Sequence, residues 1–280
     1  MKVAVTGASG FIGRNILTAL TQEKVGILAI TRDAKSLANL DKSINIVELD
    51  ISDCDASTFQ KIGSPDVLIH LAWDGLPNYK SLHHFETELP KQYIFLKRLI
   101  EGGLASLLVT GTCFEYGMQT GTLSEDMIPN PSNSYGFAKN SLRQQLEFLK
   151  STNTFNLTWA RLFYMYGENQ AKASLYSQLR DAVKRGDEVF NMSGGEQLRD
   201  YLSVDEVSRQ IVRLALTQRD IGTINVCSGK PISVRKLVED WMHKNNWKID
   251  LNLGFYPYSD YEPMEFWGNR SLLDRMLEKQ

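Results

Sequence analysis

A tyrosine and a lysine four residues apart, Tyr135 and Lys139, have side chains suited to moving a proton to or from a substrate oxygen. A tyrosine hydroxyl can transfer such a proton if its pKa is lowered. The segment 134–150 has apolar residues at helical spacing, so Lys139 lies one helical turn from Tyr135 and can stabilise a tyrosinate with its positive charge. A surface Tyr and Lys that merely stand four apart are the alternative.

A glycine-rich segment near the start of the chain offers a place for a phosphate. Residues 3–13, VAVTGASGFIG, put an apolar strand before Gly7, Gly10 and Gly13, and a helical pattern follows at once. The first glycine permits a tight turn, the second lets the backbone approach a pyrophosphate, and the third lets helix and strand pack closely. The helix N-terminus adds free N–H groups for the anion. The motif predicts a bound dinucleotide; a strand-to-helix turn without a ligand is the alternative.

The end of the second apolar run, GILAIT, bears on the type of dinucleotide. Proteins that prefer NAD commonly place a carboxylate there against the adenosine ribose. This chain has Thr31 and Arg32, and a guanidinium pairs with the 2′-phosphate that a carboxylate repels. The sequence therefore favours NADP(H), with NAD(H) possible if Arg32 is only a solvated loop residue and Asp33 takes the carboxylate role. Asp50 and Ile51, after the third strand, are expected to border the adenine.

The elements that position these residues alternate regularly through the first part of the chain. Short apolar runs, expected to be strands, fall at 3–7, 26–31, 44–50, 66–72 and 106–112. Apolar strands of this kind are typical of a parallel sheet covered by helices on both faces, and right-handed crossovers then give a doubly wound α/β (Rossmann) fold.

The alternation weakens further along the chain, where Gly, Pro and aromatic residues become denser. We therefore expect a dinucleotide-binding domain over residues 1–167. Residues 168–280 are expected to form a smaller, partly interleaved substrate-binding region, with some segments returning to the first domain.

Composition and charge exclude several classes of protein. The 280 residues are 42% hydrophobic and 23% charged, with a net charge of −2 and scattered Lys and Arg, so no nucleic-acid partner is expected. Three distant cysteines and four histidines match no disulfide or metal pattern, and His83 and His84 lie on a polar segment. No apolar run reaches the ~20 residues that span a bilayer, and the start of the chain does not resemble a signal peptide. We expect a cytoplasmic protein without a metal or membrane partner.

Taken in order, these motifs resemble the extended short-chain dehydrogenase/reductases, in particular the NAD-dependent epimerase/dehydratase family. The resemblance rests on Gly7-x-x-Gly10-x-x-Gly13, Thr112, Tyr135-x-x-x-Lys139 and the segments 70–72, 161–167 and 199–207. It covers nearly the whole chain. It implies a nicotinamide cofactor, a nucleotide-diphosphate sugar as substrate, and a homodimer formed by the helix of Tyr135 and the helix near 88–101.

The resemblance also assigns roles to residues. Tyr135 and Lys139 would be catalytic, with Lys139 also holding the nicotinamide ribose, and Thr112 would orient the substrate oxygen. Cofactor contacts are expected from Gly7, Ser9, Gly10, Phe11, Ile12, Gly13, Arg32, Asp50, Ile51, Leu71, Ala72, Tyr135, Lys139 and Leu162. Substrate contacts are expected from Thr112, Cys113, Phe114, Tyr164 and Arg199.

Two of these substrate residues, Arg199 and Tyr164, stand at positions where the family has a characteristic residue. Arg199 matches a family arginine that contacts the diphosphate, with a surface ion pair to Asp205 or Glu206 as the alternative. Tyr164 stands where the family usually has Asn.

Departures from the family pattern narrow the expected activity. Dehydratases carry an Asp-Glu pair after the catalytic Ser/Thr, and this chain has Cys113 and Phe114, which excludes 4,6-dehydration. The segments GTCFEYG and YEPMEFWGN resemble bacterial reductases that make deoxysugar donors. We expect NADPH-dependent reduction of the C4 keto group of a nucleotide-diphosphate 4-keto-6-deoxyhexose, for surface polysaccharide such as O-antigen. The alternatives are a 4-epimerase that keeps NAD bound and a non-catalytic NADP-binding redox sensor.

Overall fold

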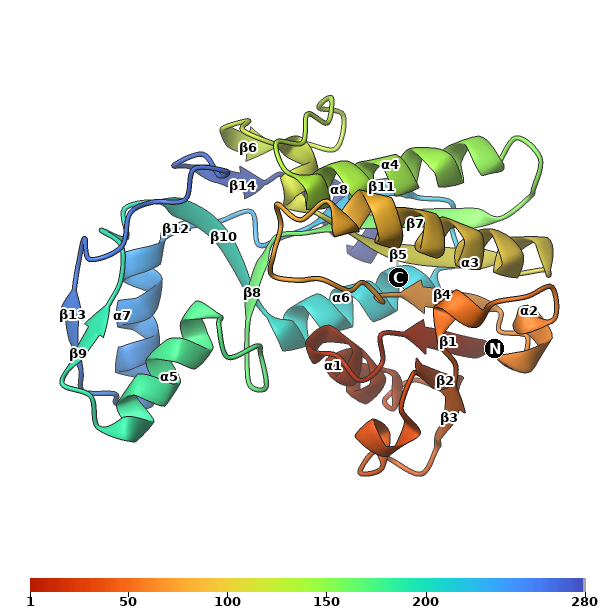
Figure 1. Ribbon diagram of the computed structural model, residues 1–280, viewed down its shortest axis with the longest axis horizontal. Helices are drawn as coiled ribbons and strands as arrows, with labels where there is room; N and C mark the ends of the chain where they lie inside the picture. Colours follow the sequence, from red (N-terminus) through yellow and green to blue (C-terminus); the bar gives the residue numbers. More distant parts are fainter. Residues whose placement is uncertain (279–280) are drawn as a thin grey trace.

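The computed structural model describes residues 1–278 and has a seven-stranded sheet at its centre (Figure 1). The strands are all parallel, in the order β11-β7-β5-β4-β1-β2-β3. Their bounds are β1 Lys2–Thr6, β2 Gly26–Thr31, β3 Ile44–Glu48, β4 Val67–His70, β5 Ser106–Thr112, β7 Asn156–Leu162 and β11 Gly222–Val226. The order reverses between β1 and β4, which confirms the expected doubly wound sheet and marks where such folds bind ligands.

Helices cover both faces of this sheet, which is why its strands are almost entirely apolar. One face packs against α1 (Phe11–Leu20), α6 (Val204–Leu216) and α8 (Ser271–Glu278). The other face packs against α3 (Leu89–Glu101) and α4 (Ser134–Leu149). Each face has its own cluster of buried apolar side chains. Since α6, α8 and β11 come late in the chain, the large body is completed by segments from beyond residue 167.

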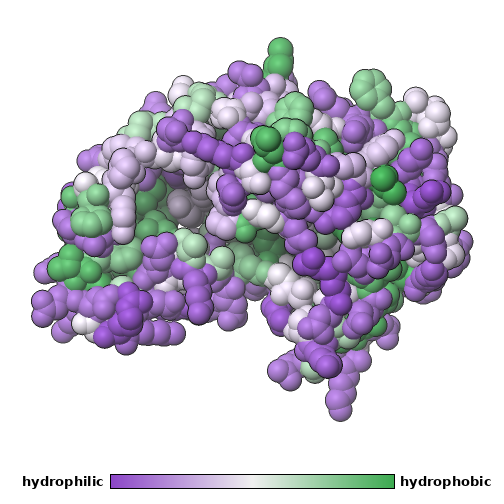
Figure 2. All heavy atoms as spheres, in the orientation of Figure 1, coloured by the Kyte–Doolittle hydropathy of each residue, from purple (hydrophilic) through white to green (hydrophobic). Residues whose placement is uncertain are grey.

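A smaller part of the molecule, at the left of Figure 1, is built from α5 (Leu175–Arg185), α7 (Val234–Asn245), β9 (Val189–Asn191) and β13 (Asp250–Asn252). It has its own apolar core. Figure 2 shows a hollow between this part and the large body, with apolar side chains inside it. A division of the chain at residues 167 and 168 remains a proposal, and residues 279–280 lie outside the described part.

The other elements of the described residues are short. The remaining strands are β6 Gly121–Leu123, β8 Tyr164–Tyr166, β10 Leu198–Ser203, β12 Pro231–Ser233 and β14 Phe266–Gly268. The remaining helical segments are η1 Ala34–Leu37, η2 Ile51–Asp53, α2 Thr58–Lys61, η3 His84–Glu88 and η4 Cys113–Tyr116. Within residues 1–278, no helix is both long and apolar enough to cross a membrane.

A buried ion pair lies beneath the carboxyl end of β5. The Glu115 carboxylate is fully buried and accepts hydrogen bonds from Arg161 Nε at 2.8 Å and from the Trp159 indole N–H at 2.9 Å. It also accepts the backbone N–H of Thr112 at 2.9 Å, while the Thr112 hydroxyl accepts the N–H of Phe114 at 3.3 Å. This reciprocal cap starts η4 and fixes the backbone of Thr112.

Arg161→Met is expected to lower the free energy of unfolding by about 3–5 kcal/mol, because it leaves Glu115 as an uncompensated buried charge. Arg185→Met is the matched control: Arg185 pairs with Asp187 at an exposed position, and such pairs contribute about 0–1 kcal/mol. Urea unfolding followed by circular dichroism measures both variants. Equal losses in the two would contradict the role given to the buried pair.

Candidate active site

The glycine-rich loop joins β1 to α1 and is too crowded for side chains at two of its glycines. Gly7 has a φ of +66°, and a Cβ there would lie 2.9 Å from the backbone nitrogen of Ala72. A Cβ on Gly13 would lie 2.2 Å from the carbonyl oxygen of Gly7. Gly10 is the N-cap of α1 and has no side chain to cap it, so the first N–H groups of this helix are left to a ligand.

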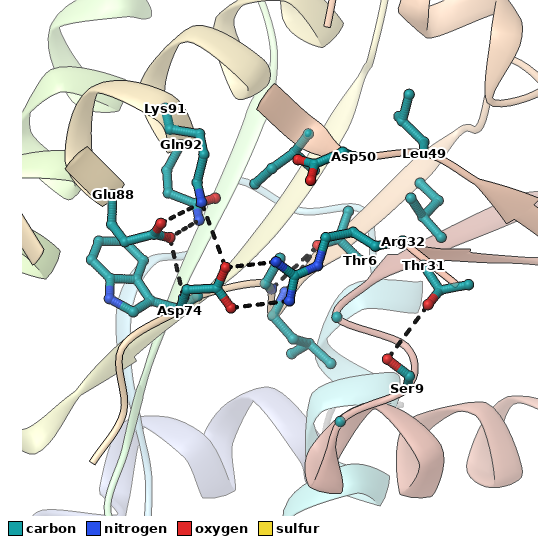
Figure 3. A pocket seen from close by; sticks show the side chains of 17 residues that line it. Thr6, Ser9, Thr31, Arg32, Leu49, Asp50, Asp74, Glu88, Lys91 and Gln92 are labelled. Carbon is teal, nitrogen blue, oxygen red and sulfur yellow. Dashed lines mark hydrogen bonds and ion pairs between the residues drawn. The ribbon is translucent and has the colours of Figure 1, made fainter. Parts of the chain in front are cut away.

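Two adjoining cavities follow this loop along the carboxyl end of the sheet. The first, of about 220 Å³, is shown in Figure 3; its lining includes the predicted cofactor residues Gly7, Ser9, Gly10, Arg32, Asp50, Ile51, Leu71 and Ala72. The second, of about 300 Å³, is lined by the other predicted cofactor residues Phe11, Ile12, Tyr135, Lys139 and Leu162. Leu71 and Trp73 line both cavities, so the two are neighbours. Gly13 lies behind the loop, against Gly7.

This arrangement fits a dinucleotide. An extended ligand can lie across both cavities, with its pyrophosphate at the glycine loop, where a side chain in place of Gly7 or Gly13 would meet backbone atoms. Asp50, at the adenosine end, accepts hydrogen bonds from Ser52 through its carboxylate. These bonds lower the pKa of Asp50.

Thr112, Tyr135 and Lys139 come together in the second cavity. Tyr135 and Lys139 project from α4, and Thr112 ends β5. Lys139 Nζ donates a hydrogen bond to the carbonyl oxygen of Thr110 at 2.9 Å and lies 5.9 Å from the centroid of the Tyr135 ring. Cys113 and Phe114 line the same cavity. The structure therefore brings together the residues that the sequence proposed for proton transfer and orientation.

Burial controls the charges of this group. Lys139 is only 1% exposed, and desolvation lowers its pKa to about 7, although Glu115 and Glu88 act to raise it. Burial, together with Tyr79 and Glu115, raises the pKa of Tyr135 above its ordinary value. Burial therefore disfavours both the tyrosinate form of Tyr135 and the ammonium form of Lys139. If both form together, their opposite charges stabilise one another.

Three aromatic rings around Tyr135 were not predicted from the sequence. The rings of His84, Tyr79 and Trp73 lie 5.3, 5.7 and 5.9 Å from that of Tyr135. Trp73 also contacts Lys139, whose Nζ lies 4.0 Å from the centroid of the indole ring. An aromatic residue directly after the buried strand end HLA was the one signal available for Trp73.

The polar setting expected for His84 is wrong, because the side chain is fully buried in η3. Its Nδ1 accepts the indole N–H of Trp73 at 3.1 Å, and its Nε2 donates to the carbonyl oxygen of Asn78 at 2.9 Å. Burial lowers the pKa of His84, which favours the neutral ring that these two bonds require.

Thr31 and Arg32 stand at the end of β2 and line the first cavity. The Thr31 hydroxyl lies 3.5 Å from the hydroxyls of Ser9 and Ser36. The Arg32 guanidinium donates two hydrogen bonds to Asp74, at 2.9 and 3.2 Å (Figure 3).

The Asp33 carboxylate makes a local contact with its own segment of the chain. Its carboxylate accepts the backbone N–H of Lys35 at 2.9 Å and caps η1. Asp33 is not among the residues that line the first cavity.

Arg199 and Tyr164 line a third cavity, of about 480 Å³, on the side of the smaller part. Arg199 is 5% exposed, and its Nε and Nη2 donate to Glu262 at 3.1 and 2.9 Å. The alternative of a surface ion pair with Asp205 or Glu206 is therefore wrong. Tyr164 lines the second cavity as well, so the third cavity adjoins the one that holds Tyr135.

Comparison with protein families agrees with this geometry. The pattern of the NAD dependent epimerase/dehydratase family matches residues 3–227. The chain belongs to this family. It is an NAD-dependent enzyme of the oxidoreductase type, as the order of its motifs predicted.

Two relatives in Aggregatibacter actinomycetemcomitans are similar to this chain. One, dTDP-6-deoxy-L-talose 4-dehydrogenase (NAD(+)), is 32% identical over 96% of this chain and 99% of the relative. The other, GDP-6-deoxy-D-talose 4-dehydrogenase, is 25% identical over 85% of this chain and 78% of the relative. The first match extends over essentially the full length of both proteins.

Among solved structures, this chain is similar to a UDP-glucose-4-epimerase from Stenotrophomonas maltophila with bound NAD. That match has a TM-score of 0.86, 20% identity, and covers 99% of this chain and 92% of the other. A UDP-glucuronic acid 4-epimerase from Bacillus cereus gives a TM-score of 0.82 at 23% identity, over 100% and 94% of the two chains. Both likenesses concern the fold, and they agree with the doubly wound sheet.

Lys139→Met is expected to flatten the dependence of stability on pH between about 7 and 10.5. The unfolded chain holds the Lys139 proton up to its ordinary pKa of 10.5, whereas the folded protein releases it near 7, so the contribution of this group makes stability rise with pH in this window. The variant loses this slope and gains most stability at the lower pH. Urea unfolding from pH 7 to 10 measures it, with Lys184→Met at an exposed position of α5 as control. A slope equal to wild type in Lys139→Met would contradict the buried, neutral lysine.

Proposed function

We propose that this enzyme reduces the C4 keto group of a nucleotide-diphosphate 4-keto-6-deoxyhexose, giving a 6-deoxysugar donor for surface polysaccharide. The proposal depends on one observation: Thr112, Tyr135 and Lys139 line the same cavity, the second one. This cavity lies between the first cavity, at the glycine loop, and the third cavity, which Arg199 lines. The names of the two relatives support C4 of a 6-deoxyhexose as the reacting position. A 4-dehydrogenase and a 4-keto reductase catalyse one reaction in opposite directions.

Each residue at the centre has a defined role in this proposal. The bound cofactor supplies the hydride that C4 receives. Tyr135 gives its hydroxyl proton to the C4 oxygen, and Lys139 stabilises the tyrosinate left behind and holds the nicotinamide ribose. The Thr112 hydroxyl accepts the N–H of Phe114, so its own hydrogen is left to bind and orient the C4 oxygen.

We propose NADP(H) as the preferred cofactor and NAD(H) as an accepted one. Proteins that prefer NAD have a ribose-binding carboxylate at the end of the second strand, and that carboxylate would repel a 2′-phosphate. This chain has the uncharged Thr31 and the cation Arg32 there, and both line the first cavity. Asp33, the alternative carboxylate, is engaged as the cap of η1. The hydroxyl of Ser9, which accepts a hydrogen bond from Thr31 and lines the same cavity, adds a neutral donor for a phosphate or a ribose.

The substrate is proposed to extend from the second cavity into the third, with its diphosphate near Arg199 and residues 168–280 forming the substrate-binding part. The Glu262 carboxylate already accepts from one edge of the Arg199 guanidinium, through Nε and Nη2, so a diphosphate has to share or displace this partner. Cys113, Phe114 and Tyr164 then border the sugar.

A homodimer through α3 and α4 is part of the proposal. It is supported by large apolar side chains on these helices that are left exposed, namely Ile94 at 50%, Phe137 at 50% and Phe148 at 79%. A cytoplasmic place of action is proposed on the grounds of sequence given above.

The test is an NADPH-oxidation screen at 340 nm against 4-keto-6-deoxyhexoses linked to dTDP, CDP and GDP. Net oxidation with one of them, and a product with a C4 hydroxyl, is the expected result. Interconversion of 4-hydroxy nucleotide sugars with no net change in absorbance would instead establish the 4-epimerase. Cofactor binding without turnover of either sugar class would establish the redox sensor.

Tyr135→Phe is expected to reduce kcat by at least about a hundredfold, the usual contribution of a positioned proton donor. Its affinity for NADPH should stay close to wild type, because the variant loses only the transferred proton. Steady-state kinetics and fluorescence titration of NADPH measure the two effects. Turnover above about a tenth of wild type would remove Tyr135 from the reaction.

Replacing both Arg199 and Glu262 with Gln is expected to raise the substrate KM about ten- to a hundredfold, as for loss of a charge-assisted hydrogen bond. The double variant removes both charges and leaves neither unpaired. A contact remote from C4 acts about equally in ground and transition states, so kcat should change less. Arg209→Ala, which removes an exposed arginine paired with Glu206, is the control. An unchanged KM would place the diphosphate elsewhere.

A further inference from the structure

Arg32 has a partner in the structure. Its guanidinium and the Asp74 carboxylate form a two-bonded ion pair at 2.9 and 3.2 Å, and both residues line the first cavity (Figure 3). The pair connects the end of β2 with the loop that follows β4. The side chains are 62% and 44% exposed, so water reaches the pair and a stronger anion can replace the carboxylate.

Asp74 is held in place from the opposite side. Its backbone N–H donates to Glu88 Oε2 at 3.1 Å, and Lys91 forms ion pairs with both Glu88 and Asp74. Glu88 is fully buried and also accepts the Gln92 amide at 2.8 Å, while Gln92 contacts His70 at 2.7 Å. This buried network fixes the backbone of Asp74, so the carboxylate stays near Arg32.

We propose that Asp74 is a residue that determines cofactor specificity, by competing with the 2′-phosphate of NADP(H) for the Arg32 guanidinium. The phosphate and the carboxylate are both anions that favour the same planar fork. While Asp74 remains beside Arg32 it also repels the phosphate, which carries close to two negative charges at neutral pH. NAD(H) lacks that phosphate and does not compete for the pair. Asp74 thus weakens a preference for NADP(H) that Arg32 alone would make stronger.

The inference rests on the proposed cofactor site and is independent of the sugar substrate. It is tested by the dissociation constants of NADPH and NADH, measured by fluorescence titration of the purified protein without sugar. Asp74→Asn is expected to raise the ratio of the NADH constant to the NADPH constant about three- to tenfold, through tighter NADPH binding. Asp74→Ser, which leaves no amide to bind Arg32, should give the same result.

Asp33→Asn is the matched control. Asp33 is the residue next to Arg32, its carboxylate caps η1, and this substitution removes the same charge as Asp74→Asn does. It is expected to change the ratio less than about twofold. Adding Arg32→Ala to Asp74→Asn should abolish the gain, since no guanidinium remains to bind the phosphate.

Three results would overturn the inference. An unchanged ratio in both Asp74 variants would show that Asp74 does not compete. An equal rise in Asp33→Asn would assign the effect to overall charge, and a gain that survives Arg32→Ala would assign it to another cation. If the wild type bound neither cofactor, the proposed cofactor site itself would fail and this inference with it.

Discussion

The structure depends on holding one ionisable side chain, that of Lys139, almost out of water at the end of the central sheet. Its Nζ donates to the Thr110 carbonyl oxygen and rests on the Trp73 ring, and Glu115 and Glu88 favour its charged form from two directions. Glu115 belongs to the core beneath β5, and Glu88 belongs to the wall of the first cavity. Lys139 therefore connects the two regions electrostatically: burial disfavours its ammonium form, and the two carboxylates offset part of that cost.

The same arrangement explains why the loop after β4 matters to both ends of a dinucleotide. Trp73 lines the first and second cavities and contacts Lys139, while its neighbour Asp74 pairs with Arg32. The backbone of this loop is fixed by Glu88, which in turn is buried by the first turns that lead into α3. A shift of this loop would thus move residues of the first and the second cavity together.

Sequence reasoning predicted the sheet, the glycine loop and the pair Tyr135 and Lys139, because those features depend on periodicity and on short spacings, whereas Thr112 was assigned through the resemblance to the family. It did not predict the partners of the charges. Asp74 lies 42 residues from Arg32, and Glu262 lies 63 residues from Arg199. Tertiary packing decides which carboxylate pairs with which guanidinium, and a local sequence pattern does not contain this information. His84 shows the same limit, because a polar neighbourhood in sequence became a buried one when η3 packed against α4.

The late return of the chain to the large body has a consequence for how the protein is made. Strand β11 and helices α6 and α8 complete one edge and one face of the sheet, and α8 spans residues 271–278. During synthesis the first strands and α1 emerge long before α6 and α8, so the part of this face that α1 does not cover stays open to water or to chaperones until these two helices have left the ribosome. A fragment ending at residue 167 would lack β11, α6 and α8 and would keep that part of the face uncovered.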